Sequence, residues 1–396
     1  MRIFLVLLFA YVLSQFYRAF LAIVAGDLSR DLGLDAAQLG ALSAIWFATF
    51  AIAQFPVGYA LDRIGPRRTI AGFMVIAVVG AWLMSAATGY YTALAAMAAI
   101  GVGCSPILMG SLYLFARNYP AERFAMLSSF MIGFGSLGNM LGATPLAVAV
   151  EAFGWRESMM GIAAITAAST LVCLAILRDP PRAAQTGPGG GMLSGIVEIA
   201  TLRGVWLIMP FTFVSYAIVV ATRGLWIAPY FNEVHGFTTT QTGNAALIMA
   251  ATMTLGALAY GPIERLIRDP KRTVAIGSFI TVICFIAVAF VGEGRAIMAV
   301  ALIGAIGGFG MTFGIVMAHG RLFFPAHLIG RGVTFLNFAS IAGAGVTQWL
   351  SGQFIQLKID SGADPATTYA TLFFAFGAAL AITLLIYLAS PARPKP

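Results

Sequence analysis

The chain has 396 residues, of which 60% are apolar and only 10% are charged. A soluble domain carries charges on about a quarter of its residues, so this composition excludes a water-facing surface over most of the chain and indicates a membrane protein. The formal net charge of +8 does not indicate a nucleic-acid partner, because the basic residues lie in short segments between apolar runs, as in the loops of membrane proteins.

Apolar runs of about twenty residues, the length that crosses a bilayer, recur along the whole chain. The first set lies near residues 4–25, 39–60, 69–87, 92–115, 125–149 and 157–177, and the second near 204–230, 240–261, 274–292, 296–318, 331–356 and 367–389. The first run lacks the small-residue cleavage site of a signal peptide, so we expect it to stay in the protein as a helix. The sequence therefore predicts an all-α membrane protein with 12 transmembrane helices.

A polar segment separates the two sets of runs. It contains Asp179-Pro180-Pro181-Arg182 and the sequence Gly187-Pro188-Gly189-Gly190-Gly191, which is typical of a flexible linker. We therefore expect an N-terminal six-helix bundle over residues 1–177, a cytoplasmic linker over 178–203 and a C-terminal six-helix bundle over 204–396.

Lysine and arginine are distributed unevenly between the two sides of the predicted membrane domain. If the N-terminus is cytoplasmic, most of the 23 basic residues fall in cytoplasmic segments, and the opposite side holds Arg30, Arg156, Arg295 and Lys358. This excess of positive charge predicts that both termini are cytoplasmic. We expect a multi-pass protein of the bacterial inner membrane.

Two segments, one in each half, are similar in sequence. Gly58 to Thr69 reads GYALDRIGPRRT after the second run, and Gly261 to Thr273 reads GPIERLIRDPKRT after the eighth. Each contains a glycine, an acid followed by arginine, and a proline followed by basic residues. Internal repeats of this kind are typical of transporters whose halves rock about a central site.

The segment from Gly58 to Arg68 resembles the signature that members of the major facilitator superfamily carry between their second and third helices. The resemblance covers essentially the full chain and implies the fold of that superfamily, two pseudo-symmetric six-helix bundles, in a monomeric protein. It also implies a charge latch that closes the cytoplasmic side, with the gating residues Gly58, Asp62, Arg63, Arg67, Arg68 and Arg117. Glycine permits close approach of a neighbouring helix, and Asp62 is expected to pair with Arg117. The alternative is a solvated turn with ordinary positive-inside charges.

Two arginines interrupt the apolar runs, whereas the acidic residues lie in loops or at the ends of runs. Arg18 and Arg223 are separated by 205 residues, and a tyrosine, Tyr11 or Tyr216, precedes each by seven. Seven residues are nearly two helical turns, so this spacing predicts that each tyrosine and its arginine share one face of a helix. The candidate substrate-binding residues are therefore Arg18, Arg223, Tyr11, Tyr216, Gln15, Trp226 and Tyr230.

An arginine inside a membrane costs roughly 2.5–3.5 kcal/mol on insertion scales and therefore requires a partner. No acid lies within the apolar runs, so we expect an anionic ligand, a carboxylate or a phosphate, held by two guanidinium groups. The pair resembles the arrangement in the organophosphate and organic-anion branches of the superfamily, which implies this role for Arg18 and Arg223. The alternatives are snorkelling toward the interface and hydrogen bonding to backbone carbonyls.

The sequence therefore predicts a secondary transporter that moves a small organic solute, interpreted here as an anion, by alternating access. The histidines, His235, His319 and His327, lie at the ends of runs or in loops, so exchange or potential-driven movement is favoured over proton coupling. The expected partners are this solute and the lipid bilayer. We expect no catalytic residue, no metal and no cofactor.

Other functions stay open at this stage. The tyrosine and tryptophan content suits an aromatic nutrient such as riboflavin, and Met249 and Met253 suit Cu(I). A weaker resemblance to copper and riboflavin importers of the CcoA type points the same way, although methionine is also an ordinary packing residue. Drug efflux is a further alternative. The latch motif argues against a receptor without transport, and the lack of a nucleophile–base set, metal cluster or phosphate loop argues against an enzyme.

Overall fold

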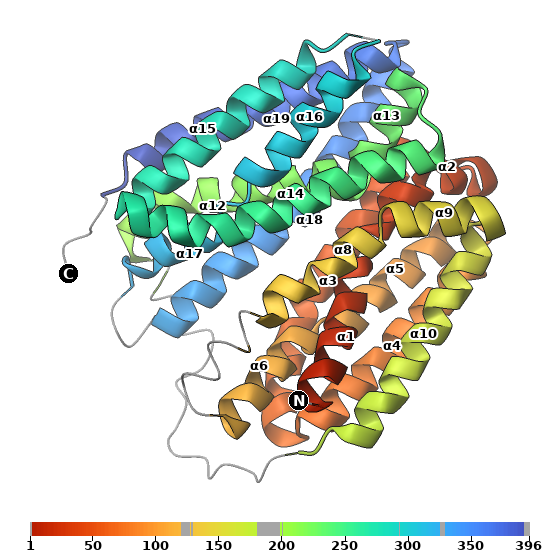
Figure 1. The fold of residues 1–396 in the computed structure, drawn as a ribbon, viewed down its shortest axis with the longest axis vertical. Helices are drawn as coiled ribbons and strands as arrows, with labels where there is room; N and C mark the ends of the chain where they lie inside the picture. Colours follow the sequence, from red (N-terminus) through yellow and green to blue (C-terminus); the bar gives the residue numbers. More distant parts are fainter. Residues whose placement is uncertain are drawn as a thin grey trace. The chain divides into compact units, whose positions relative to one another are not determined.

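The computed structural model describes residues 2–119, 127, 130–179, 199, 201–292, 294–324 and 329–391. Most of the predicted linker, together with His327, lies outside this part of the chain. Within the described ranges all regular secondary structure is helical (Figure 1). The predicted all-α fold class is confirmed.

The helices follow one another with short connections. Those of the first half are α1 (Arg2–Phe16), α2 (Phe20–Leu32), α3 (Ala36–Arg63), α4 (Pro66–Ser85), α5 (Tyr90–Cys104), α6 (Pro106–Asn118), α8 (Leu137–Leu141), α9 (Thr144–Phe153) and α10 (Trp155–Ile176). Those of the second half are α12 (Arg203–Ala221), the π-helix η1 (Thr222–Trp226), α13 (Ile227–His235), α14 (Thr239–Ile267), α15 (Pro270–Ala289), α16 (Ala296–Phe309), α17 (Phe313–Arg321), α18 (Ile329–Asp360) and α19 (Pro365–Leu388).

These helices combine into membrane-spanning segments, so the protein is a multi-pass membrane protein. Among the described residues 10 segments are long and apolar enough to cross a bilayer, and the pair α1 and α2, bent by 42°, brings the number to 11. The remaining predicted run, 331–356, lies within α18, which is 32 residues long. Its apolar residues alternate with glycine, serine, threonine and glutamine, which lowers its hydropathy.

The repeated segments differ in structure from the loops that their charges suggest. The apolar runs end near residues 60 and 261, but α3 continues to Arg63 and α14 to Ile267. The reversals that follow are short, Ile64-Gly65 and Arg268-Asp269. Each contains a residue with positive φ, 102° at Gly65 and 56° at Arg268, a conformation that turns the chain sharply at the helix end.

The chain divides into two compact units. The first unit comprises the described residues within 1–184, 224–232 and 236–247, and the second those within 185–223, 233–235 and 248–396.

In the first unit α4 packs between α5 and α10, and the three lie side by side in Figure 1. The ends of α4 and α10 stabilise each other. Arg67 Nε at the start of α4 donates to the carbonyl of Leu174 in the last turn of α10, at 2.8 Å. Arg156 Nη1 at the start of α10 donates to the carbonyls of Ser85 and Ala87 at the end of α4, at 3.0 and 2.7 Å. Each arginine therefore satisfies carbonyls that a helix end leaves without partners.

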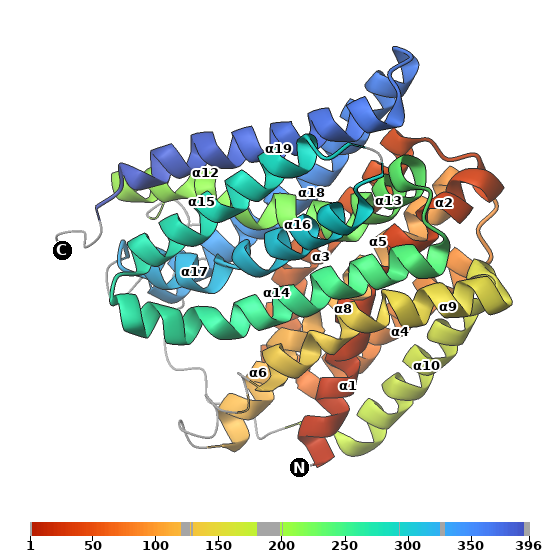
Figure 2. The same cartoon turned by 45° about the horizontal axis from the view of Figure 1, so that its top comes forward.

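In the second unit α15 packs against α16 and α19, and α12 packs against α18 and α19 (Figure 2). Lys271, in the first turn of α15, donates from Nζ to the carbonyls of Leu388 and Ser390 at the end of α19, at 2.7 and 2.6 Å. Lys271 follows the proline of its repeat as Arg67 does in the other half. The repeated segments thus hold the end of the last helix in both halves.

Candidate functional site

Arg18 lies in a break of the first span. Helix α1 ends at Phe16 and α2 begins at Phe20, and between them Arg18 N and Ala19 N donate to carbonyls three residues earlier, at 3.2 and 2.9 Å. α1 and α2 are bent by 42° relative to each other, so the expectation of an unbroken helix is wrong here.

The Arg18 side chain lies against aromatic rings of α3. Its Cζ is 5.3 Å from the ring centroid of Trp46 and 4.8 Å from that of Phe50. These distances are within the range of cation–π interactions. Arg18 Nε and Gln15 Oε1 are both buried without a hydrogen-bond partner among the described residues. Trp46 and Phe50 could not be predicted as neighbours of Arg18, because they lie on another helix.

Arg223 lies in the irregular turn of the seventh span. It belongs to the π-helix Thr222–Trp226 between α12 and α13, and its exposed fraction is 5%. A π-turn widens the helix by one residue and is frequent at functional sites. The two arginines that the repeat relates therefore both occupy an interruption of their span, the feature from which transporters build central binding sites.

The predicted aromatic residues are buried or half-buried. Tyr11 is 4% exposed and lies in an apolar cluster of the first unit, where a Cβ on Gly135 would collide with its ring. Tyr216 is half-buried, with its ring centroid 5.2 Å from that of Phe313. Trp226 and Tyr230 are 1% and 3% exposed. Tyr11 and Tyr216 therefore contribute to helix packing, whatever further role they have.

The gating segment is placed only in part. The side chain of Asp62 lies outside the described residues, so its pairing with Arg117 stays a prediction. Arg117 Nη2 donates to the hydroxyl of Tyr113 at 3.4 Å, and Arg63 lies over the ring of Tyr59 at 5.7 Å. Arg68 is exposed. A Cβ on Gly58 would meet nothing within 4 Å, so the close approach expected there is not found among the described residues.

An acid that the sequence did not single out, Asp179, lies at this segment. Its Oδ1 accepts a hydrogen bond of 2.7 Å from the backbone N–H of Arg67, and its carboxyl carbon would lie 2.6 Å from a Cβ on Gly65. In the second repeat Asp269 occupies the position of Gly65 and accepts from the N–H of Arg272 at 3.1 Å. Both helices are thus capped by a carboxylate. The carboxylate at α15 belongs to Asp269, the residue just before that helix, whereas the one at α4 belongs to Asp179, which follows α10.

Comparisons with known proteins agree with this architecture. A family model described as Major Facilitator Superfamily matches residues 7–348. The 4-hydroxybenzoate transporter PcaK of Pseudomonas aeruginosa is 27% identical over 161 residues, which cover 40% of this chain but only 36% of that transporter. The probable sulfoacetate transporter SauU of Cupriavidus necator is 23% identical over 311 residues, covering 74% of this chain and 69% of that one.

The fold is also that of a solved structure. A bacterial homologue of the human lysosomal transporter Spinster, in an inward-facing and unoccupied conformation, superposes with a TM-score of 0.82 at 18% sequence identity. The superposition covers 100% of this chain and 98% of the other.

Proposed function

The chain belongs to the major facilitator superfamily of membrane transporters, and we propose that it is a secondary transporter that moves a small organic anion by alternating access. We further propose that Arg18 and Arg223 bind the anionic group, that the two bundles are joined by the 178–203 linker, and that both termini face the cytoplasm of a bacterium. The protein acts as a carrier, not as an enzyme.

The environment of Arg18 carries the proposal. A guanidinium group stacked on aromatic faces keeps its N–H groups at the edge of the plane, where they are aligned for a carboxylate or a phosphate. Arg18 Nε is buried and has no hydrogen-bond partner among the described residues. Leaving a charged donor unsatisfied away from water is costly. An anionic ligand removes this cost, and Trp46 and Phe50 offer an apolar wall for its organic part.

The named substrates of the relatives support the same chemical class. 4-Hydroxybenzoate and sulfoacetate both carry a carboxylate at neutral pH, and the names are those of the transporters that match this chain. We therefore propose a small organic carboxylate as the substrate.

The methionine pair gives no comparable support for copper. Met249 is fully buried and Met253 is 7% exposed, and a Cβ on Gly307 would lie 3.1 Å from Met249 Cγ. Met249 therefore fills the contact between α14 and α16. No cluster of three histidine, cysteine or acidic side chains suited to a metal occurs in the described part of the chain.

A ligand screen by thermal unfolding tests the proposal. A ligand that binds only the folded state at 100 times its Kd stabilises the protein by about 2.7 kcal/mol. We expect 4-hydroxybenzoate or another organic carboxylate to raise the Tm, and its uncharged amide to have no effect. Arg18→Gln should abolish the shift, whereas Arg295→Gln, an exposed control, should retain it. Equal shifts with acid and amide would refute an anion site.

A further inference from the structure

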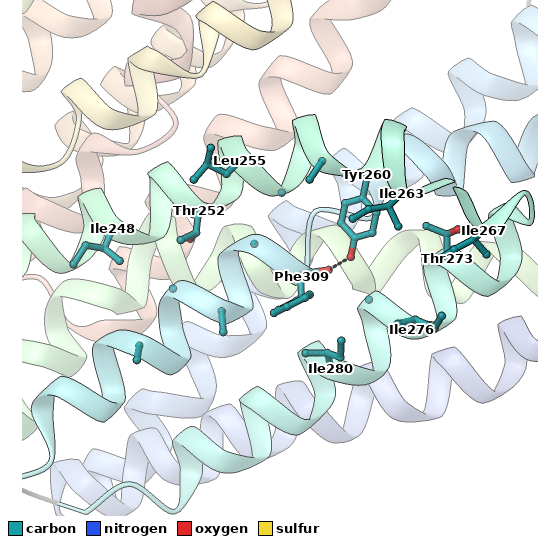
Figure 3. A pocket seen from close by; sticks show the side chains of 17 residues that line it. Ile248, Thr252, Leu255, Tyr260, Ile263, Ile267, Thr273, Ile276, Ile280 and Phe309 are labelled. Atoms are coloured by element: carbon teal, nitrogen blue, oxygen red, sulfur yellow. Dashed lines mark hydrogen bonds between the residues drawn. The ribbon is translucent and has the colours of Figure 1, made fainter. Parts of the chain in front are cut away.

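The second unit carries an apolar groove between α14, α15 and α16 (Figure 3). Its volume is about 430 Å³. Small residues, among them Gly256, Gly304 and Gly308, form the floor of the groove. Residues with branched side chains form its walls. The wall residues Leu255, Ile263 and Ile276 are 65%, 40% and 53% exposed, so the groove opens to the outside of the unit, the side that faces lipid in a membrane-spanning helix.

The groove has a smooth floor because α14 and α16 touch through their backbones. A Cβ on Gly256 would overlap the carbonyl group of Gly308. The Tyr260 ring points to the floor, and its hydroxyl donates to the carbonyl of Phe309 at 2.5 Å, as Figure 3 shows. Helix α15 contributes Ile276 and Ile280 to the opposite wall.

The polar groups of the groove are already satisfied within the protein. Besides Tyr260, the hydroxyls of Thr252 and Thr273 donate to the carbonyls of Met249 and Asp269, at 2.9 and 3.0 Å. A polar solute would therefore find no free hydrogen-bonding side chain among these three. A hydrocarbon chain needs no hydrogen-bonding partner, and it gains dispersion contacts with the apolar walls of the groove.

The dimensions of the groove suit an acyl chain. The residues of α14 that line the groove run from Ile248 to Ile267, an advance of 19 residues that corresponds to about 28 Å along the axis. One leaflet supplies about half of a hydrocarbon core roughly 30 Å thick. The half of the groove that ends at Ile267 thus has about the depth of the leaflet that the basic residues assign to the cytoplasm.

Positive charge lies at the end of the groove where Ile267 and Thr273 meet. The last turn of α14, the reversal that follows it and the first turn of α15 together contain Arg265, Arg268, Lys271 and Arg272. Two of these are engaged, Arg272 with Asp269 at 3.2 Å and Lys271 with the end of α19. Arg265 and Arg268 are exposed and have no ion-pair partner among the described residues. Basic pockets at the cytoplasmic ends of membrane helices bind anionic lipid head groups.

We propose that this groove binds an anionic phospholipid, with one acyl chain between α14, α15 and α16 and the phosphate on Arg265 and Arg268. The site is separate from the proposed substrate site and does not depend on what the protein carries.

Native mass spectrometry of the delipidated protein tests the proposal. Phosphatidylglycerol and phosphatidylcholine with identical dioleoyl chains are compared, and we expect phosphatidylglycerol to bind about tenfold more tightly, since each basic residue near a lipid surface adds attraction. Arg265→Gln with Arg268→Gln should reduce phosphatidylglycerol binding to the level of phosphatidylcholine. Arg295→Gln with Lys358→Gln is the matched control and should leave the preference unchanged.

A second pair of variants tests the acyl chain. Ala259 is exposed in the groove, so Ala259→Trp should fill it and weaken both lipids. Leu258→Trp changes the neighbouring exposed residue, which does not line the groove, and should have no effect. Equal binding of the two lipids by the wild-type protein would overturn the head-group assignment. Equal effects of the two tryptophan variants, competition by glycerol 3-phosphate alone, or displacement by a transported solute would overturn the groove assignment.

Discussion

The Oδ1 atom of Asp179 accepts a hydrogen bond of 2.7 Å from the backbone N–H of Arg67, 112 residues earlier in the chain. The bond joins the residues just after α10 to the first turn of α4. Gly65 precedes that turn with a φ of 102°, and any larger residue there would displace the Asp179 carboxylate. The start of the predicted linker is thus attached to the gating segment.

Asp179→Ala should destabilise the first unit, because α4 loses its capping carboxylate. Caps of this kind contribute about 1 kcal/mol. Asp179→Asn keeps the accepting oxygen and should retain most of the stability. Thermal unfolding of the purified protein measures both, and an Asn variant as unstable as the Ala variant would show that the hydrogen bond is not responsible.

Lys271→Met should destabilise the end of α19. The ammonium group holds two backbone carbonyls at 2.7 and 2.6 Å, and a cation at a helix C-terminus contributes about 0.3–1 kcal/mol. Arg272→Met is the matched control, since its ion pair with Asp269 involves an arginine side chain that is 79% exposed and exposed pairs contribute little. Hydrogen exchange of residues 384–390 should rise in the Lys271 variant and stay unchanged in the control.

Gly138→Ala should disrupt the packing of α8 against α1. The added methyl group would overlap the carbonyl oxygen of Val12 and lie 2.8 Å from Cβ of Gln15. Overpacking of this kind costs about 1–3 kcal/mol. Gly161→Ala in α10 meets nothing within 4 Å and should be neutral or stabilising. Comparable losses of Tm in both variants would contradict the close contact at Gly138.

Asp364 should make the stability depend on pH under acidic conditions. Its carboxylate caps α19 and accepts from the N–H of Thr367 at 2.9 Å, and hydrogen bonds from the backbone and side chain of Thr367 hold its pKa below the ordinary value of 3.8. A folded-state pKa below the unfolded one gives stability that is present above pH 3.8 and is lost as the pH falls through the folded-state value. The Tm difference between wild type and Asp364→Ala should therefore shrink in strongly acidic buffer. A difference that grows with acidity would have the wrong sign.

The sequence was sufficient for the fold because the signals are repeated and local. Apolar runs of bilayer length predict spans one at a time, and the similarity of Gly58–Thr69 to Gly261–Thr273 predicts two related halves. The capping role of Asp179 could not be predicted from the sequence, since it depends on a contact between residues that are far apart in the chain. The one available signal for this cap was the alignment of the repeats, in which Gly65 stands at the position that Asp269 occupies in the second.

The breaks at the two arginines could not be predicted either. Tyr17, Arg18 and Ala19 contain no proline or glycine, so nothing in this stretch indicates the end of α1 at Phe16. In the seventh span Gly224 follows Arg223, but a single glycine inside an apolar run does not specify a π-turn. Trp46 and Phe50 approach Arg18 only through the tertiary fold. Nothing in the sequence distinguishes these two residues from ordinary core residues.

Counterflow in proteoliposomes tests the central claim most directly. Vesicles loaded with an unlabelled organic carboxylate, such as 4-hydroxybenzoate, should take up the labelled compound through the wild-type protein. Arg18→Gln and Arg223→Gln should each reduce the initial rate at least about tenfold, the loss expected when one charged hydrogen bond of 1.5–3 kcal/mol is removed. Uptake that is undiminished in both variants would show that Arg18 and Arg223 do not bind the substrate.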